Sequence, residues 1–250
     1  MLFAHALARD RVWLVSHSGD AVDEAAREKA EVLFARRRLG EPVAYLLGER
    51  EFWGLTLEVS PAVLIPRPET ERLVELALER LPANREASVL DMGTGSGAIA
   101  IAIAAERPRA HVTAIDASRD ALAVARTNIA RHGERVRLLQ SDWFVALGGE
   151  RFDLIVSNPP YIAGADAHLG EGDLRFEPKN ALTPGASGME AIEAIAVGAS
   201  SHLEQGGWLL IEHGWDQRAA CIELFTRLGF SEVADHDDLA GVPRVIAGRL

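Results

Sequence analysis

The run Asn158-Pro159-Pro160-Tyr161 carries groups well suited to chemistry on a nitrogen atom. Proline fixes φ and has no N–H to donate, so the run predicts a rigid turn that presents bare carbonyl acceptors. With the side-chain carbonyl of Asn158, such a turn can accept both hydrogens of one NH₂ group and stabilise positive charge that develops on its nitrogen. Tyr161 can stack on a flat acceptor group. All four residues are therefore candidate substrate-binding residues, and Asn158, Pro159 and Tyr161 are candidate catalytic residues.

The acceptor that this turn suits is a planar amide nitrogen. Such a nitrogen is a poor nucleophile because its lone pair is delocalised, so a site must align it and favour its developing charge. An isolated run of this kind is usually only an Asx-Pro turn. The interpretation as a site therefore depends on the elements that precede the run.

A glycine-rich turn, Gly93-Thr94-Gly95-Ser96-Gly97, separates an apolar strand from an apolar helix. Glycine lets the backbone approach a ligand closely, and the free N–H groups of a helix start favour an electron-rich ligand group. Asp116, at the end of the next strand, is placed to accept hydrogen bonds from two ribose hydroxyls. Together these features predict an adenosine-type ligand. Gly93, Gly95 and Ala98 also fit a dinucleotide fingerprint, so a nicotinamide-dependent oxidoreductase is the competing interpretation on this motif alone.

The elements that must position these groups alternate between strand and helix. Short apolar runs at 88–92, 111–116, 136–142, 152–158 and 208–214 predict strands, with helices between several of them. Ser118 is a suitable N-cap for the helix that ends at Gly133. This order implies an α/β fold with a parallel sheet covered on both faces. The long Gly-, Asp- and Pro-rich segment 163–187 breaks the alternation and is expected to be functional.

The first part of the chain predicts a different architecture. An amphipathic helix is expected over about 20–39, with Val22, Ala26, Ala30, Leu33 and Phe34 on one face and a solvated end at Arg36 to Arg38. A β-hairpin is then expected, turning near Ser60-Pro61. We therefore divide the chain into a helical N-terminal domain (1–50), a hairpin linker (51–66) and a main domain (67–250).

Composition restricts the partners and the surroundings. The net charge of −11 disfavours broad binding to nucleic acid. The single cysteine, Cys221, and the interrupted N-terminal segment fit a cytoplasmic protein without a membrane segment. Trp53, Trp208 and Trp215 are expected to pack in the interior. No histidine has metal-ligand spacing, so no metal site is expected. Glu212-His213-Gly214 ends a strand at the ligand edge of the sheet, where it can contact a ligand.

The chain resembles the glutamine-N5 methyltransferases that modify class I peptide chain release factors, the PrmC or HemK family. The resemblance runs from about Arg37 to the C-terminus. It is carried by the motifs RRxxGEPVAYLLGxxEFWGL, LIPRPETE, LDMGTGSGAIAIA, SDWF, SNPPYI and RFEPKNAL. Asp91 and Gly97, around the glycine turn, also resemble the first motif of class I methyltransferases rather than an oxidoreductase.

The resemblance implies a class I methyltransferase fold, Rossmann-like, with a mainly parallel seven-stranded sheet. It also implies S-adenosylmethionine as cofactor, S-adenosylhomocysteine as product, and a release factor as protein substrate. We expect the protein to be a monomer. The implied cofactor-binding residues are Gly93, Thr94, Gly95, Ser96, Gly97, Asp116, Asp142, Trp143 and Asn158. Trp143 is expected near the adenine, Arg67 to Glu71 on the cofactor side, and Asn158 to Tyr161 around the acceptor glutamine of a Gly-Gly-Gln loop. The N-terminal helices are expected to help dock the release factor, and they are shorter before Glu51 than is usual for the family.

Three alternatives remain at this point. Enzymes that methylate a glutamine of a ribosomal protein share the Asn-Pro-Pro-Tyr run, although Arg67 to Glu71 resembles the release-factor branch more closely. An adenine-N6 methyltransferase would face the same geometric problem at an exocyclic NH₂, but the acidic balance and the lack of a basic target-recognition module disfavour it. A non-enzymatic adenosine-binding module would need only the glycine turn and Asp116.

Overall fold

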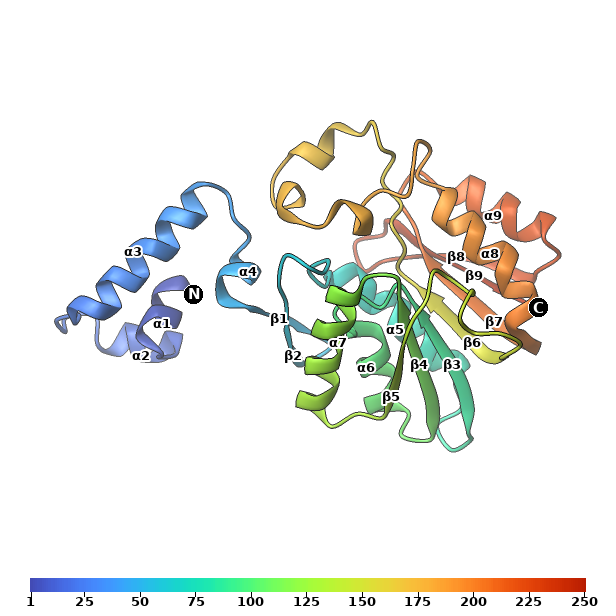
Figure 1. Ribbon diagram of the computed structural model, residues 1–250, viewed down its shortest axis with the longest axis horizontal. Helices are drawn as coiled ribbons and strands as arrows, with labels where there is room; N and C mark the ends of the chain where they lie inside the picture. Colours follow the sequence, from blue (N-terminus) through green and yellow to red (C-terminus); the bar gives the residue numbers. More distant parts are fainter.

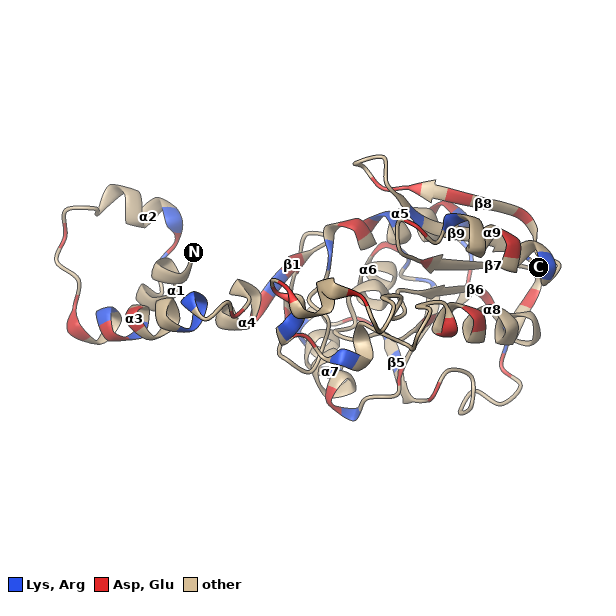
Figure 2. Ribbon diagram, turned by 90° about the horizontal axis from the view of Figure 1, so that it is seen from above, with Lys and Arg blue, Asp and Glu red and all other residues tan.

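The computed structural model describes residues 1–250. Its N-terminal part is a small group of helices. It contains α1 (Leu2–Leu7), α2 (Arg11–Ser16), α3 (Glu24–Arg38) and α4 (Val43–Leu47). Asp10 caps α2 and Asp23 caps α3, each accepting a backbone N–H. In Figures 1 and 2, α1 to α3 lie at one end of an elongated molecule, and α4 with β1 connects them to the main domain.

Helix α3 differs in detail from the expected amphipathic helix. Ala26, Ala30 and Leu33 are buried, as expected, but Val22 precedes the cap and Phe34 is 39% exposed. The expected apolar face was therefore too wide. Val22 falls outside the helix because the cap at Asp23 starts it later than the apolar spacing suggests.

A two-stranded hairpin, β1 (Glu49–Phe52) and β2 (Leu55–Glu58), follows α4. Its turn is at Trp53-Gly54, with φ of 54° and 70°, so the expected turn near Ser60-Pro61 was wrong. A two-residue turn with two positive φ values matches the twist of the paired strands, and Pro61 has no N–H to donate to a ladder. The segment beyond β2 is irregular but still buries Val63 and Ile65.

The main domain contains a seven-stranded sheet in the order β5-β4-β3-β6-β7-β9-β8. The strands are β3 (Ala87–Met92), β4 (Ala110–Asp116), β5 (Val136–Gln140), β6 (Phe152–Ser157), β7 (Leu203–Glu212), β8 (Ser231–Asp237) and β9 (Pro243–Arg249). The first five are parallel, and β9 pairs antiparallel with both β7 and β8. The expected mainly parallel α/β sheet is confirmed.

Helices cover both faces of this sheet (Figure 1). On one face lie α5 (Glu71–Arg80), α6 (Ala98–Glu106) and α7 (Arg119–His132), and on the other α8 (Glu190–His202) and α9 (Arg218–Arg227). Adjacent residues of β3 belong to opposite cores, since Val89 packs in the cluster that contains α5 and α6, and Leu90 in the cluster that contains α8 and α9. This alternation of side chains explains why both faces of the strand are apolar.

Several local predictions about the ends of helices are confirmed. The Ser118 hydroxyl accepts the Ala121 N–H at the start of α7, and Gly133 ends that helix with φ of 69°. None of the helices combines the length and apolar character needed to span a bilayer. Of the tryptophans expected to pack, Trp53 and Trp208 contact the core, but Trp215 is 68% exposed because it lies in the loop after β7.

Candidate active site

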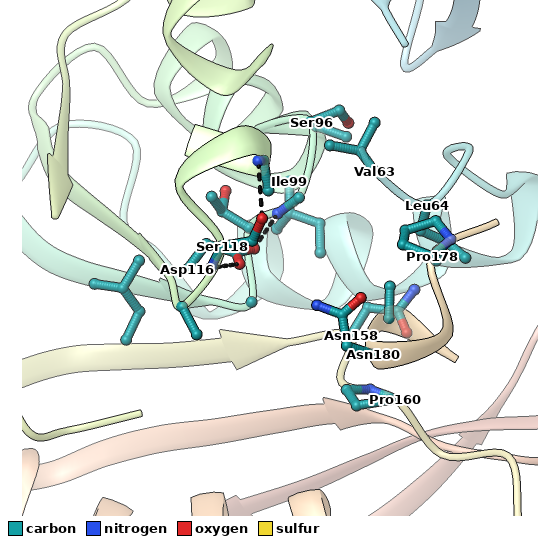
Figure 3. Close-up of a pocket in the computed structure, with 18 of the residues that line it drawn as sticks. Val63, Leu64, Ser96, Ile99, Asp116, Ser118, Asn158, Pro160, Pro178 and Asn180 are labelled. Carbon is teal, nitrogen blue, oxygen red and sulfur yellow. Dashed lines mark hydrogen bonds between the residues drawn. The ribbon is translucent and has the colours of Figure 1, made fainter. Parts of the chain in front are cut away.

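A cavity lies at the carboxyl ends of β3, β4 and β6, where open parallel sheets bind ligands. Of the predicted cofactor-binding residues, Gly93, Thr94, Gly95, Ser96, Asp116, Asp142, Trp143 and Asn158 line it, and Gly97 does not. Of the predicted acceptor-binding residues, Asn158 and Pro160 line it, while Pro159 and Tyr161 do not. Figure 3 shows Asp116 and Ser118 on one side of the cavity, with Asn158, Pro160 and Asn180 together on the other.

The glycine turn forms one wall of the cavity. Gly93 and Gly95 have φ of 69° and 55°, and a Cβ on either would meet no atom within 4 Å, so the space beside this backbone is open. Gly97 has φ of 85°, and a Cβ there would lie 3.2 Å from Ile101 Cδ1. Gly97 therefore serves the packing of α6, and the two earlier glycines leave room for a ligand.

Asp116 holds this turn from the neighbouring strand. Its two carboxylate oxygens accept the N–H groups of Gly95 and Ser118, each at 2.9 Å. Burial raises the pKa of Asp116, and the two N–H groups act in the opposite direction. Each oxygen keeps a further lone pair, so the carboxylate can still accept a hydroxyl of a ligand in the cavity.

Asp91 lies beneath the turn and is fully buried. One of its oxygens accepts the Thr94 hydroxyl at 2.6 Å and the Ala100 N–H at 3.2 Å, which ties the turn to α6. Burial raises the pKa of this carboxyl to about 7. Asp91 does not line the cavity, so it supports the turn from below.

The raised pKa of Asp91 predicts a pH-dependent stability. Between pH 3.8 and about 7 the folded protein keeps a proton on Asp91 that the unfolded chain has released, so stability falls as pH rises through this window. The loss is on the order of 4 kcal/mol. We expect Asp91→Asn to flatten the dependence of unfolding free energy on pH, as measured by urea denaturation from pH 5 to 8. Equal slopes in the variant and the wild type would contradict the expectation.

Asn158 faces the cavity from the end of β6. Its side-chain NH₂ donates to the Thr70 hydroxyl at 3.0 Å, so its carbonyl oxygen is the group that remains free. The strand end before it is fixed, because the Ser157 hydroxyl donates to the Met92 carbonyl at 2.7 Å. Thr70, at the end of a 3-10 turn (Pro68–Thr70), also lines the cavity.

Tyr161 lies behind this wall. Its hydroxyl donates to Glu212 Oε1 at 3.2 Å, and its carbonyl accepts the side chain of Gln217 at 3.0 Å. The predicted stacking of Tyr161 on the acceptor therefore remains a prediction, and in this geometry the ring anchors the turn. The neighbouring His213 is buried, with Nε2 2.6 Å from Asp235 Oδ2, and neither it nor Glu212 lines the cavity.

The long segment 163–187, which the sequence predicts to be functional, contributes one wall of the cavity. Pro178, Asn180 and Ala181 line the cavity, and the segment is held by an ion pair of 2.6 Å between Arg67 and the buried Glu177. Asn180 was named only as part of a family motif. No local signal in the sequence places its side chain opposite the glycine turn.

The same segment contacts the N-terminal helices. Arg37 pairs with Asp173 at 3.2 Å, and Arg175 donates to the Leu39 carbonyl at 2.8 Å. Arg36 pairs with Glu41. Arg36, Arg37 and Arg38 are exposed in the last turn of α3, as expected. The sequence does not reveal the pairing of Arg37 with Asp173, because the two residues lie far apart along the chain.

Family models, curated relatives and a solved structure all relate this chain to methyltransferases. The Methyltransferase small domain model matches residues 70–176, and the PrmC N-terminal domain model matches residues 1–48. A release factor glutamine methyltransferase of Xylella fastidiosa is 53% identical over 249 residues, covering 99% of this chain and 90% of the relative. A release factor glutamine methyltransferase of Bordetella pertussis is 52% identical over 251 residues, covering 100% of this chain and 93% of that relative. The crystal structure of a Pyrococcus furiosus methyltransferase shares the fold, with a TM-score of 0.60 and 22% identity over 90% of this chain and 98% of that one.

Proposed function

The chain belongs to the release factor glutamine methyltransferase family, and from this premise we propose that it transfers a methyl group from S-adenosylmethionine to the side-chain amide nitrogen of a release-factor glutamine. The single observation that carries the proposal is the free carbonyl of Asn158, which faces the same cavity as Gly95 and Asp116. We take the acceptor to be the glutamine of the Gly-Gly-Gln loop of class I release factors. The reaction would then take place in the cytoplasm, where translation ends.

The cavity fits S-adenosylmethionine in three respects. The open space beside Gly93 and Gly95 suits a ligand that lies against the backbone, and the start of α6 suits an electron-rich group. The Asp116 carboxylate can accept ribose hydroxyls, and Trp143, with Asp142, lines the part assigned to adenine. When bound, the cofactor supplies an electrophilic methyl group on a sulfonium.

The chain's own groups then act on the acceptor amide. Asn158 Oδ1 accepts one N–H of the glutamine, and a carbonyl of the proline turn accepts the other, so that the nitrogen is aligned with the methyl group. These two oxygens also stabilise the positive charge that develops on the nitrogen. Pro160 and Asn180 form the adjoining wall. We assign Pro159 and Tyr161 to shaping the turn from behind the cavity.

The N-terminal helices are proposed to contact the release factor. They expose apolar side chains that the chain itself does not cover: Val12 at 77%, Val15 at 74%, Val32 at 58% and Leu39 at 75%. We assign these side chains to the contact with the protein partner. The contacts of Arg37 and Arg175 place this unit beside the segment that lines the cavity.

Methyl-labelled S-adenosylmethionine and an unmodified release factor test the proposal directly. We expect label on the glutamine of the Gly-Gly-Gln loop, located by mass spectrometry, and no label on a release factor with Gln→Ala at that position. A ribosomal protein and an adenine-containing oligonucleotide serve as competing acceptors. Label on either of these, with none on the release factor, would refute the assigned acceptor.

A further inference from the structure

A chain of buried polar groups lies behind Asn158, and the proposed reaction does not use it. Thr70 is 4% exposed and accepts the Asn158 NH₂ at 3.0 Å. Glu212 is 1% exposed and accepts the Tyr161 hydroxyl at 3.2 Å. The second oxygen of Glu212, Oε2, is buried and receives no hydrogen bond. A buried carboxylate oxygen without a partner is costly, so its presence beside the site needs an explanation.

The orientation of the Asn158 carboxamide decides whether it can hold an amide acceptor. The two ends of a carboxamide have nearly the same shape, but one accepts hydrogen bonds and the other donates them. With its NH₂ on Thr70, Asn158 turns its oxygen to the cavity. A flipped carboxamide would present its NH₂ to the NH₂ of the glutamine, and the acceptor would be repelled.

The Thr70 hydroxyl by itself does not fix this orientation, because a hydroxyl can both donate and accept. A nearby carboxylate removes the ambiguity, since an ionised carboxylate only accepts. Burial raises the pKa of Glu212, and the Thr70 hydroxyl, as a hydrogen-bond donor, acts in the opposite direction. Oε2 of Glu212 is available to receive the Thr70 proton, which leaves the Thr70 lone pair for Asn158.

We propose that Thr70 and Glu212 are positioning residues that hold the Asn158 carboxamide with its NH₂ turned away from the acceptor and its oxygen turned toward it. The inference rests on the role of Asn158 in the proposed function. Glu212 also anchors the proline turn through the Tyr161 hydroxyl. The Glu212 carboxylate thereby supports both oxygens that accept the glutamine NH₂. It supports the Asn158 side-chain oxygen through Thr70, and the backbone oxygen of the proline turn through Tyr161.

Paired substitutions at Thr70 separate this role from simple packing. Thr70→Val keeps the shape and removes the hydroxyl, so we expect kcat to fall about tenfold with little change in the Kd for S-adenosylmethionine. Thr70→Ser keeps the hydroxyl and is expected to recover most of kcat. Equal kcat in the two variants would overturn the proposal. If both are impaired, packing accounts for Thr70, and if both resemble the wild type, its hydroxyl is not needed.

The second readout is the pH profile of Glu212→Gln. Burial raises the pKa of Glu212 to about 7, and the titratable groups that act on it are Tyr161, Arg244 and Glu69. Wild-type kcat should rise with pH through about 7 as Glu212 becomes a pure acceptor. In Glu212→Gln this rise should be absent, with kcat several-fold lower at pH 8. An unchanged rise in the variant would exclude Glu212 from the role.

Asn158→Ala, assayed in parallel, distinguishes failure of the proposed function from failure of the positioning role alone. If that variant keeps turnover, the proposed role of Asn158 is wrong and the positioning role fails with it. If Asn158→Ala is inactive while Thr70→Val matches the wild type, only the positioning role fails. Loss of turnover in Asn158→Ala, with the expected contrast between Thr70→Val and Thr70→Ser, supports both.

Discussion

Asn158→Ala is expected to lower kcat by about 10²- to 10³-fold while the Kd for S-adenosylmethionine stays within a few-fold of the wild type. The side chain reaches the cavity from the end of β6, and its free oxygen is the acceptor assigned to the glutamine amide. That oxygen acts most strongly when the nitrogen gains positive charge, so its loss raises the barrier more than it weakens binding. Single-turnover methyl transfer and calorimetry measure the two quantities separately.

The matched control is Asn84→Ala, which makes the same truncation at an exposed loop residue far from the cavity lining. We expect it to leave both kcat and Kd unchanged. Thermal denaturation of Asn158→Ala checks that the fold survives the loss of the bond to Thr70. If Asn158→Ala no longer binds S-adenosylmethionine at all, the residue belongs to the cofactor site and its assignment to the acceptor is wrong.

Much of the main domain could be predicted because its signals are local. Each central strand is a short apolar run, and Ser118 and Gly133 mark helix ends by interactions within a few residues. The final strands β8 and β9 carry mixed polarity, and sequence reasoning did not locate them individually. The hairpin turn was misplaced because Trp53 adopts a positive φ that a large side chain rarely takes, whereas Pro61 looked like the obvious turn residue.

The candidate site likewise contains some residues that could be predicted from the sequence and others that could not. The glycine turn, Asp116 and Asn158 follow three strands of one parallel sheet, so their meeting at one edge follows from the predicted topology. Thr70 is 88 residues from its partner Asn158 in sequence, and Asn180 enters from an irregular segment. No periodicity or local motif encodes such contacts, because packing of the whole domain brings these residues together.

The position of Tyr161 depends on contacts that its motif does not encode. Its aromatic ring suggested stacking on the acceptor, but the hydroxyl is bonded to Glu212 and the residue does not line the cavity. The buried end of β7 supplies the acceptor for that hydroxyl, and only the paired sheet brings β6 and β7 together. A tyrosine beside a reactive turn can therefore anchor the turn, and the stacking of Tyr161 on the acceptor stays a prediction.

Asp116→Ala is expected to raise the Kd for S-adenosylmethionine about 100-fold, with kcat at saturating cofactor reduced only a few-fold. The carboxylate is assigned to the ribose hydroxyls, and hydrogen bonds to a charged acceptor contribute about 1.5–3 kcal/mol each. It also holds the Gly95 N–H at 2.9 Å, so its loss loosens the wall against which the ligand lies. Asp120→Ala is the control, because it removes the same charge from an exposed position in the first turn of α7. Calorimetry measures the affinity of both variants for S-adenosylmethionine. If Asp120→Ala weakens binding as much as Asp116→Ala does, Asp116 acts only through overall charge, and its assignment to the ribose would have to be abandoned.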